Sequence, residues 1–177
     1  MPQIPLIGIA GRARSGKDTV ANFALAAIGG YLYSFADPIR AMLVPLGIDM
    51  RDPYWQARKE EVIPALGVSP RKLMQTLGTE WGRELINPEL WLLLARQRLL
   101  QHGPGMIVTD VRFENEAAWV RDNGGMIIHV IRPDAPGVRE HTSESGVAIQ
   151  PADVQLFNSG TLEELQSSVR ALFRVYD

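Results

Sequence analysis

The stretch Gly11-Arg12-Ala13-Arg14-Ser15-Gly16-Lys17 lies between an apolar run, Ile4–Ala10, and a segment of helical character that begins at Lys17. It fits the pattern G-x-x-x-x-G-K, and a strand before it with a helix after it separates a phosphate-binding P-loop from a chance match. Glycine at the first and last loop positions permits backbone angles that side chains disfavour, so main-chain N–H groups can turn inward around an anion. The positive end of the following helix favours the same anion. The stretch therefore predicts a cradle for a nucleoside triphosphate, with Lys17 among its β- and γ-phosphates. The alternative is a glycine-rich turn without a ligand.

The sequence allows two residues of this loop as the metal ligand. A Ser or Thr usually follows the P-loop lysine and binds Mg²⁺, but here Asp18 follows it and Thr19 comes next. Either Asp18 contacts the metal, directly or through water, or Thr19 does so from one position further on. The residues that we expect to contact the nucleotide are Gly11, Ala13, Arg14, Ser15, Gly16, Lys17, Asp18 and Thr19.

The composition is that of one folded domain. The chain has 177 residues, a formal net charge of −2 and no cysteine. These values exclude disulfides and thiolate chemistry and give no basic field for nucleic acid or anionic membranes. No apolar run approaches the length of about 20 residues that spans a bilayer. We therefore expect a cytoplasmic protein that acts on small molecules, and the sequence leaves open whether it is a monomer or a homodimer.

Strand and helix signals alternate along the chain. Five short apolar or β-rich runs predict strands at residues 4–10, 31–35, 106–111, 126–131 and 154–157. Helices are predicted at 17–28, from 37 to about 47, from 70 to about 85, from 87 to about 102, at 114–123, and after a capping box formed by Thr161 and Glu164. This alternation predicts a three-layer α/β/α fold with a five-stranded parallel sheet, whose ligands gather at the carboxyl ends of the strands.

Asp110 lies at the end of the apolar strand 106–111, where a carboxylate can hold Mg²⁺ or its water shell. Arg112 follows two residues later on the same rim. The alternative is that Asp110 only caps the helix that starts near Phe113.

The helix that begins at Pro70 has two stripes. Leu73, Leu77 and Trp81 form an apolar stripe that predicts core, whereas Arg71, Gln75, Thr79 and Arg83 form a polar stripe. The polar stripe is either solvent surface or the wall of a cleft. Gly78 and Gly82 favour the cleft, because small residues suggest close approach by another backbone or a planar ligand.

Other candidates follow the second and fourth strands. Ser34, Asp37 and Arg40 lie where an acceptor substrate could bind, although a role as helix N-cap would also explain Asp37. Arg132 opens an irregular segment and could close over the transferring phosphate, or be a surface residue.

Residues 141–144 in that irregular segment, His-Thr-Ser-Glu, have the composition of a catalytic triad. A serine nucleophile needs a rigid elbow and an oxyanion hole, and the flanking sequence supplies neither. We interpret this segment as a flap or substrate contact.

Six segments together resemble the deoxynucleoside monophosphate kinases of tailed bacteriophages, a branch of the adenylate-kinase-like P-loop kinases. These segments are GRARSGKDT at 11–19, SFADPIR at 34–40, QTLGTEWGR at 75–83, TDVRFENE at 109–116, HTSE at 141–144 and NSGTLEEL at 158–165. Each segment after the first is weak alone, but their order and spacing are specific.

The resemblance implies an ATP- and Mg²⁺-dependent phosphotransferase with an NMP-kinase-like fold that converts a deoxynucleoside monophosphate to its diphosphate for DNA synthesis. It implies one kinase domain over residues 1–177, with a helical monophosphate-binding insertion at 38–102 and a short lid-like segment at 132–151. The implied catalytic residues are Lys17, Arg112 and Arg132, and the implied metal ligands are Asp18, Thr19 and Asp110. Asn158 would lie near the adenine, and the acceptor would contact Ser34, Asp37, Arg40, Gln75, Thr79, Arg83 and Glu144.

Two other functions stay open at this point. A different small-molecule P-loop kinase, such as a dephospho-coenzyme-A kinase, would share the fold and chemistry but not the acceptor. A nucleotide-binding switch module would hydrolyse slowly and signal to a protein partner, but the guanine-specifying N-K-x-D motif is missing from the sequence.

Overall fold

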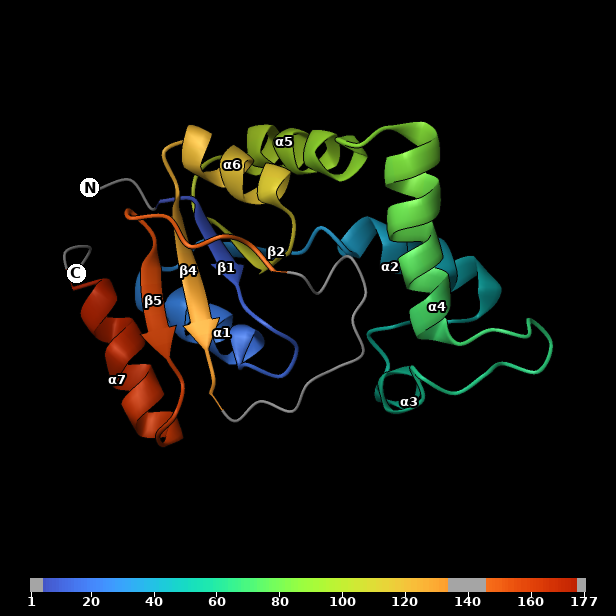
Figure 1. Cartoon of the computed structure of the whole chain (residues 1–177), viewed down its shortest axis with the longest axis horizontal. Coiled ribbons are helices and arrows are strands. Elements are labelled where there is room, and N and C mark those ends of the chain that lie inside the picture. Colours follow the sequence, from blue (N-terminus) through green and yellow to red (C-terminus); the bar gives the residue numbers. More distant parts are fainter. Residues whose placement is uncertain (1–4, 134–145, 175–177) are drawn as a thin grey trace. The chain divides into compact units, whose positions relative to one another are not determined.

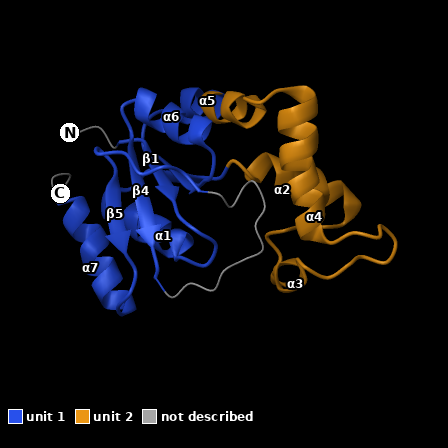
Figure 2. Cartoon of the chain, in the orientation of Figure 1, with its two compact units in different colours: residues 1–34, 97–177 blue, residues 35–96 orange. Residues whose placement is uncertain are grey.

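A computed structural model describes residues 5–133 and 146–174 and divides the chain into two compact units (Figures 1 and 2). Unit 1 comprises residues 1–34 and 97–177, and unit 2 comprises residues 35–96. No helix within the described ranges is long and apolar enough to cross a membrane.

Unit 1 contains one sheet of five parallel strands in the order β2-β3-β1-β4-β5. The strands are β1 (Ile7–Ala10), β2 (Tyr31–Tyr33), β3 (Met106–Val111), β4 (Met126–Ile131) and β5 (Val154–Phe157). Their order reverses on either side of β1, as in doubly wound folds, so the predicted fold class is confirmed. The predicted first strand, residues 4–10, was too long: β1 begins at Ile7, and Pro5, which has no N–H to donate to a ladder, lies outside it.

Helices cover both faces of this sheet. Helices α1 (Lys17–Ile28) and α7 (Leu162–Leu172) pack against each other and share a core with side chains of β1 and β4, among them Ile7, Ile9 and Ile128. Helix α6 (Glu114–Asp122) contacts β1 and β4 on the opposite face, where Val120 and Ile127 leave no space for a side chain at Gly8. The capping box predicted for α7 is present: Glu164 N donates to Thr161 Oγ1, and Thr161 N donates to Glu164 Oε2.

Unit 2 is helical. Its elements are α2 (Asp37–Leu43), the 3₁₀-helix η1 (Val44–Leu46), α3 (Pro53–Ala57), α4 (Pro70–Gln75), the π-helix η2 (Thr76–Ile86) and the first part of α5 (Leu90–His102). A small core of Leu43, Ile48 and Met50 is packed by Trp55, Ile63, Leu73, Met74 and Leu77.

The structure corrects the prediction of a regular helix from residue 70 to about 85. The helix starts as expected, with Ser69 Oγ accepting from Lys72 N at 3.2 Å, but it widens to i→i+5 bonding from Thr76 onward. A π-helix has more residues per turn, so its side chains point in directions that differ from those of a regular α-helix, and the difference grows along the helix. Leu73 and Leu77 therefore join the core as predicted, whereas Trp81 is 36% exposed and the prediction that it is core was wrong.

The two glycines of this helix are explained by neighbouring side chains. A side chain at Gly82 would overlap the Trp91 indole, and one at Gly78 would lie 2.9 Å from Ile39 Cδ1. Trp91 is buried, and its Nε1 donates to Gly78 O at 2.7 Å. The close neighbours at these positions are thus the side chains of Trp91 and Ile39, rather than the other backbone or planar ligand that the sequence suggested.

Candidate functional site

The loops that follow the five strands leave the sheet at the same edge. Ala10 is the partner of Val111 in β3 and of His129 in β4, so Gly11 and Arg112 leave neighbouring strands side by side. Asn158 follows β5, and its N–H donates to Ile131 O at 2.8 Å. In a parallel doubly wound sheet this is the edge at which ligands bind.

The P-loop has the backbone conformation that its glycines predict. Gly11 has a φ of 145° and Gly16 a φ of 100°, both in the region that favours glycine. A side chain at Gly11 would also lie 2.5 Å from Val130 O. Arg14 has a φ of 63°, the only positive value at a non-glycine position within the described ranges. Strained backbone of this kind is concentrated at ligand-binding sites.

Lys17 spans the mouth of its own loop. Its Nζ donates to Gly11 O at 2.8 Å and to Arg12 O at 2.6 Å. The ammonium group is thus held at the N-terminus of α1, where a phosphate would meet both its charge and the helix N–H groups. Asp18 is exposed on the next position and Thr19 is half-buried.

Asn158 contacts the P-loop. Its Nδ2 donates to Ser15 O at 2.8 Å, and the same nitrogen would lie 2.5 Å from a side chain at Gly16. The sequence suggested a position near the adenine, and the structure shows a bond that ties the loop after β5 to the phosphate cradle. Gly16 is therefore constrained by this contact as well as by its φ.

Asp110 is buried and bonded to a residue of the neighbouring strand's loop. Ser34 Oγ donates to Asp110 Oδ2 at 2.7 Å. The β1–β3 register shifts here, since Gly8 pairs with Val108 but Ala10 pairs with Val111, so β3 has one extra residue. Irregularities of this kind redirect side chains and are frequent beside active sites. The structure thus places Ser34, predicted as a substrate contact, against the predicted metal ligand.

Asp110 is not needed as a helix cap. The N–H groups of Arg112 and Phe113, at the start of α6, donate to Glu116 Oε2 at 2.7 and 3.1 Å. Glu116 is 2% exposed. This contact was not predicted, although a glutamate three residues after the N-cap residue Phe113 has the spacing of a capping box.

The oxygen donors near the P-loop fit Mg²⁺. This ion is usually bound by one or two carboxylates, with water and substrate phosphates completing its octahedron. Asp110 is a buried carboxylate at the end of β3, and Asp18 and Thr19 lie in the first turn of α1. Among the described residues no group of three or more His, Cys, Asp or Glu side chains could hold a metal ion.

The remaining candidates of unit 1 are cations. Arg112 is half-buried and Arg132 is exposed directly after β4. Glu144 lies outside the described residues, together with the rest of the 141–144 segment.

In unit 2 the candidates for acceptor binding lie on two helices. Asp37 is the first residue of α2 and forms an ion pair with Arg40, with 2.7 Å between Oδ1 and Nη1. Its interpretation as an N-cap was wrong, because the N-cap is Ala36 and no side chain bonds there. Gln75 ends α4, and Thr79 lies on η2; both are half-buried. Arg83 Nη1 donates to Pro88 O at 3.3 Å.

The sequence profile of a known family, deoxynucleotide monophosphate kinase, matches residues 56–169. The chain belongs to this family. The match covers more than half of the chain, and it includes η2 and the end of β3. The chain is therefore a phosphotransferase that phosphorylates deoxynucleoside monophosphates, as the resemblance implied, and kinases of this kind use ATP.

Individual relatives agree with this assignment. A protein of Acanthamoeba polyphaga mimivirus whose name places it in the same class is 29% identical over 180 residues, which cover 93% of each chain. The deoxynucleoside-5'-monophosphate kinase of Escherichia phage T5 is 32% identical over 108 residues, and the deoxynucleotide monophosphate kinase of Enterobacteria phage T4 is 34% identical over 111. These alignments cover 56% and 60% of this chain but only 43% and 46% of the phage proteins.

Solved structures support the fold alone. Shikimate kinase from Aquifex aeolicus matches with a TM-score of 0.56 at 13% identity over 96% of both chains. A gluconokinase from Sinorhizobium meliloti matches with a TM-score of 0.54 at 14% identity, over 99% of this chain and 95% of its own. The kinase therefore has the fold of P-loop small-molecule kinases.

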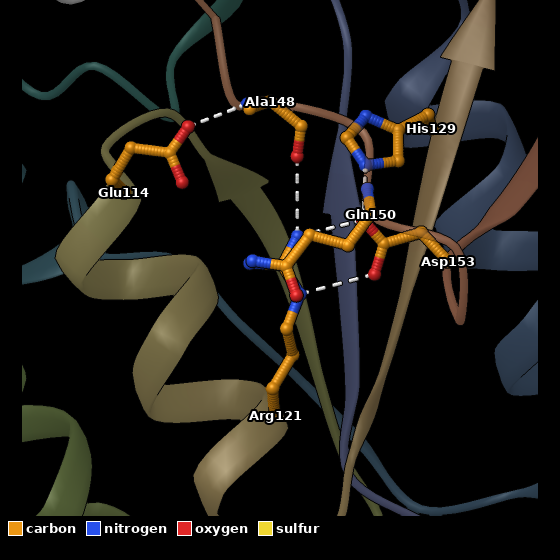
Figure 3. Close-up of polar contacts among 6 residues, drawn as sticks. All are labelled: Glu114, Arg121, His129, Ala148, Gln150 and Asp153. Atoms are coloured by element: carbon orange, nitrogen blue, oxygen red, sulfur yellow. Dashed lines mark hydrogen bonds and ion pairs between the residues drawn. The ribbon is translucent and has the colours of Figure 1, made fainter.

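A buried ionic cluster that the sequence analysis missed fixes the chain just before β5 (Figure 3). Asp153, with 2% of its side chain exposed, accepts from Arg121 Nε at 3.0 Å and Nη2 at 2.6 Å. Its Oδ2 also lies 2.9 Å from His129 Nε2 and accepts from Gln150 N at 2.8 Å. Figure 3 shows Arg121 reaching from α6 towards Asp153, while Glu114 Oε1 accepts from Ala148 N at 2.5 Å. The cluster therefore joins α6, β4 and residues 148–153.

This cluster predicts a specific acid dependence of stability. Burial alone would raise the pKa of Asp153, but hydrogen bonds from Arg121, Gln150 N and His129 lower the pKa from 3.8 to about 2. The carboxylate thus contributes stability above pH 4 that is lost as the pH falls towards 2. A shift of this size corresponds to about 2 kcal/mol. Urea unfolding between pH 2 and 7 gives the free energy of unfolding of the wild type and of Asp153→Asn. We expect the wild type to be more stable than the variant at pH 7, and this difference to shrink below pH 4. A difference that is independent of pH would contradict the ionic account.

Proposed function

We propose that the chain transfers the γ-phosphoryl group of ATP, as its Mg²⁺ complex, to a deoxynucleoside monophosphate and releases the diphosphate and ADP. The observation that carries this proposal is the grouping at one sheet edge of the P-loop with Lys17 and the buried carboxylate of Asp110. We further propose that the enzyme acts in the cytoplasm, as a monomer or homodimer.

On the donor side, the P-loop amides and Lys17 would bind the β- and γ-phosphates. The bond from Lys17 to Gly11 O would then be exchanged for phosphate oxygens, which are stronger acceptors because they are charged. Asp110, with Asp18 or Thr19, would hold Mg²⁺, which when bound neutralises charge on the β- and γ-phosphates. Ser34 would keep Asp110 in one orientation through its 2.7 Å hydrogen bond.

Arginines would supply the charge that the transferring group requires. Arg112 and Arg132 follow the third and fourth strands at the same edge, so both are proposed to contact the transferring phosphoryl group. The acceptor phosphate is already a competent nucleophile, so no strong base is required. Catalysis would consist of positioning and electrostatic stabilisation.

On the acceptor side, unit 2 would bind the monophosphate as the helical insertion predicted at residues 38–102. Arg40 and Arg83 offer guanidinium groups for the phosphate, and Asp37, Gln75 and Thr79 offer hydrogen bonds for sugar and base. Each guanidinium already has a protein acceptor, Asp37 Oδ1 for Arg40 and Pro88 O for Arg83. Ser34 and Glu144, which the sequence also assigned to the acceptor, stay proposals of the same kind.

Arg83→Ala tests the acceptor assignment. We expect the KM for the monophosphate to rise by about tenfold to a hundredfold, because a charge-assisted phosphate contact is lost, while the KM for ATP changes by less than about threefold. Steady-state kinetics with each substrate varied in turn measures both constants. Arg96→Ala, which removes an exposed arginine of α5, is the matched control. Equal changes in both KM values would remove Arg83 from the acceptor site.

The function itself is tested by a coupled assay of ADP release with ribo- and deoxynucleoside monophosphates and dephospho-coenzyme A as acceptors. The proposal predicts ADP release that depends on a deoxynucleoside monophosphate, with the diphosphate as product. Turnover with dephospho-coenzyme A alone would favour the other kinase. Slow ATP hydrolysis that no acceptor stimulates would favour the switch module.

A further inference from the structure

Glu116 is a buried carboxylate for which the proposed mechanism has no use. It is the third residue of α6 and is 2% exposed. Its Oε2 accepts from two successive main-chain groups, Arg112 N at 2.7 Å and Phe113 N at 3.1 Å. An ionised carboxylate is costly to bury unless such donors satisfy it. The contact is therefore a strong constraint on the backbone that it bonds.

Capping of a helix does not require this burial. Helix α7 has a glutamate at the same position, Glu164, whose Oε2 accepts from Thr161 N at 2.8 Å although the residue is exposed. Both glutamates accept from the N–H of the N-cap residue, Phe113 or Thr161, but Glu116 also accepts from Arg112 N. Glu164 bonds the N-cap of α7, three residues after Asn158, whereas Glu116 bonds Arg112 itself, the first residue after β3.

That turn carries the proposed phosphate-binding groups. Val111 is paired with Ala10, so Arg112 begins the turn directly beside Gly11 of the P-loop. Asp110 lies two residues earlier, in the part of β3 where the register shifts. Ser34 fixes the Asp110 side chain from β2, and Glu116 fixes the main chain of Arg112 from α6. Asp110 and Arg112, at the carboxyl end of β3, are thus each hydrogen-bonded to a residue of a different neighbouring element.

We infer that Glu116 is a positioning residue of the kinase, which fixes the main chain at Arg112 so that this arginine meets the phosphoryl group. The inference rests on the proposed function. Glu116 touches no reacting atom; it acts through Arg112. A displacement of about 1 Å in a catalytic group can cost on the order of a hundredfold in rate, which sets the scale of the expected effect.

Three single variants and one double variant test the inference. For Glu116→Ala we expect kcat to fall by about tenfold to a hundredfold, with both KM values within about threefold of wild type. Glu116→Gln retains an acceptor oxygen at the same position, so its kcat should be within about threefold of the wild-type value. Glu164→Ala is the matched control; it should lower the melting temperature, as loss of a cap does, without changing kcat.

The double variant asks whether Glu116 acts through Arg112. Residues that act as one unit show non-additive effects. We therefore expect the double variant Glu116→Ala/Arg112→Ala to have a kcat within about twofold of that of Arg112→Ala alone. A double variant whose loss of kcat equals the product of the two single losses would overturn the inference. So would an unchanged kcat in folded Glu116→Ala, or an equal fall of kcat in Glu164→Ala. If Glu116→Ala does not fold, Glu116→Gln decides: a tenfold fall in its kcat would contradict the acceptor role.

The outcomes separate this inference from the proposed function. Wild-type turnover is measured first, and a wild type without acceptor-dependent transfer would overturn both. An active wild type with unaffected Glu116 variants would overturn the positioning role alone.

Discussion

Lys17→Ala is expected to reduce phosphoryl transfer by a thousandfold or more while the chain stays folded. The ammonium group lies within 2.8 Å of Gly11 O and 2.6 Å of Arg12 O, at the mouth of the loop and the N-terminus of α1. It is therefore placed to neutralise charge on the β- and γ-phosphates as the leaving group develops. Single groups with this role are worth roughly 10³-fold or more in phosphoryl transfer. The measurement is kcat at saturating ATP and deoxynucleoside monophosphate.

The matched control is Arg170→Ala, which removes an exposed cation from the last turn of α7. It should leave kcat within about twofold, because surface charges far from the site contribute little. A melting curve for each variant separates loss of catalysis from loss of folding. A folded Lys17→Ala chain that keeps more than about a tenth of wild-type turnover would refute the role of Lys17.

The second large effect is expected for Asp110→Asn. Replacing the buried carboxylate by an amide keeps the shape but removes the charge that would bind Mg²⁺ or its water shell. We expect kcat to fall by about a hundredfold to a thousandfold and the Mg²⁺ concentration for half-maximal activity to rise by at least about tenfold. A titration of activity against Mg²⁺ at fixed ATP measures both.

Two further variants serve as a control and as a test of the hydrogen bond to Asp110. Asp122→Asn changes an exposed carboxylate at the end of α6 and should alter neither value. Ser34→Ala removes only the hydroxyl that donates to Asp110 Oδ2, so its effect should be smaller, about tenfold in kcat. An Asp110→Asn enzyme with an unchanged Mg²⁺ requirement would contradict a metal role for this carboxylate.

The parts of the fold that sequence predicted well are those that local signals determine. The strands at residues 126–131 and 154–157 were predicted with the bounds that the structure has, because turn-forming residues adjoin them, Gly124-Gly125 before the first and Asn158-Ser159-Gly160 after the second. The P-loop was recognisable because glycine at 11 and 16 is required by φ values of 145° and 100°. The capping box of α7 depends on two residues three positions apart, Thr161 and Glu164, so it too could be found without the structure.

The parts that sequence did not predict depend on neighbours that are distant along the chain. The bond from Ser34 to Asp110 joins positions 76 residues apart, and that from Asn158 to Ser15 joins positions 143 apart. The wide turn of η2 changes which side chains share a face, so a pattern that assumes a regular helix misplaces Trp81. Arg121, His129 and Asp153 form their cluster only once α6, β4 and residues 148–153 are packed together.

Every role proposed for this kinase depends on the P-loop amides and Lys17 binding the phosphates of ATP. Isothermal titration calorimetry of the folded wild-type chain with a non-hydrolysable ATP analogue and Mg²⁺ tests it most directly, with Lys17→Ala in parallel. We expect one binding site in the wild type, and an affinity that is at least about tenfold weaker in the variant. The absence of any binding heat from the wild type over a range of temperatures, or equal affinity in both proteins, would contradict it.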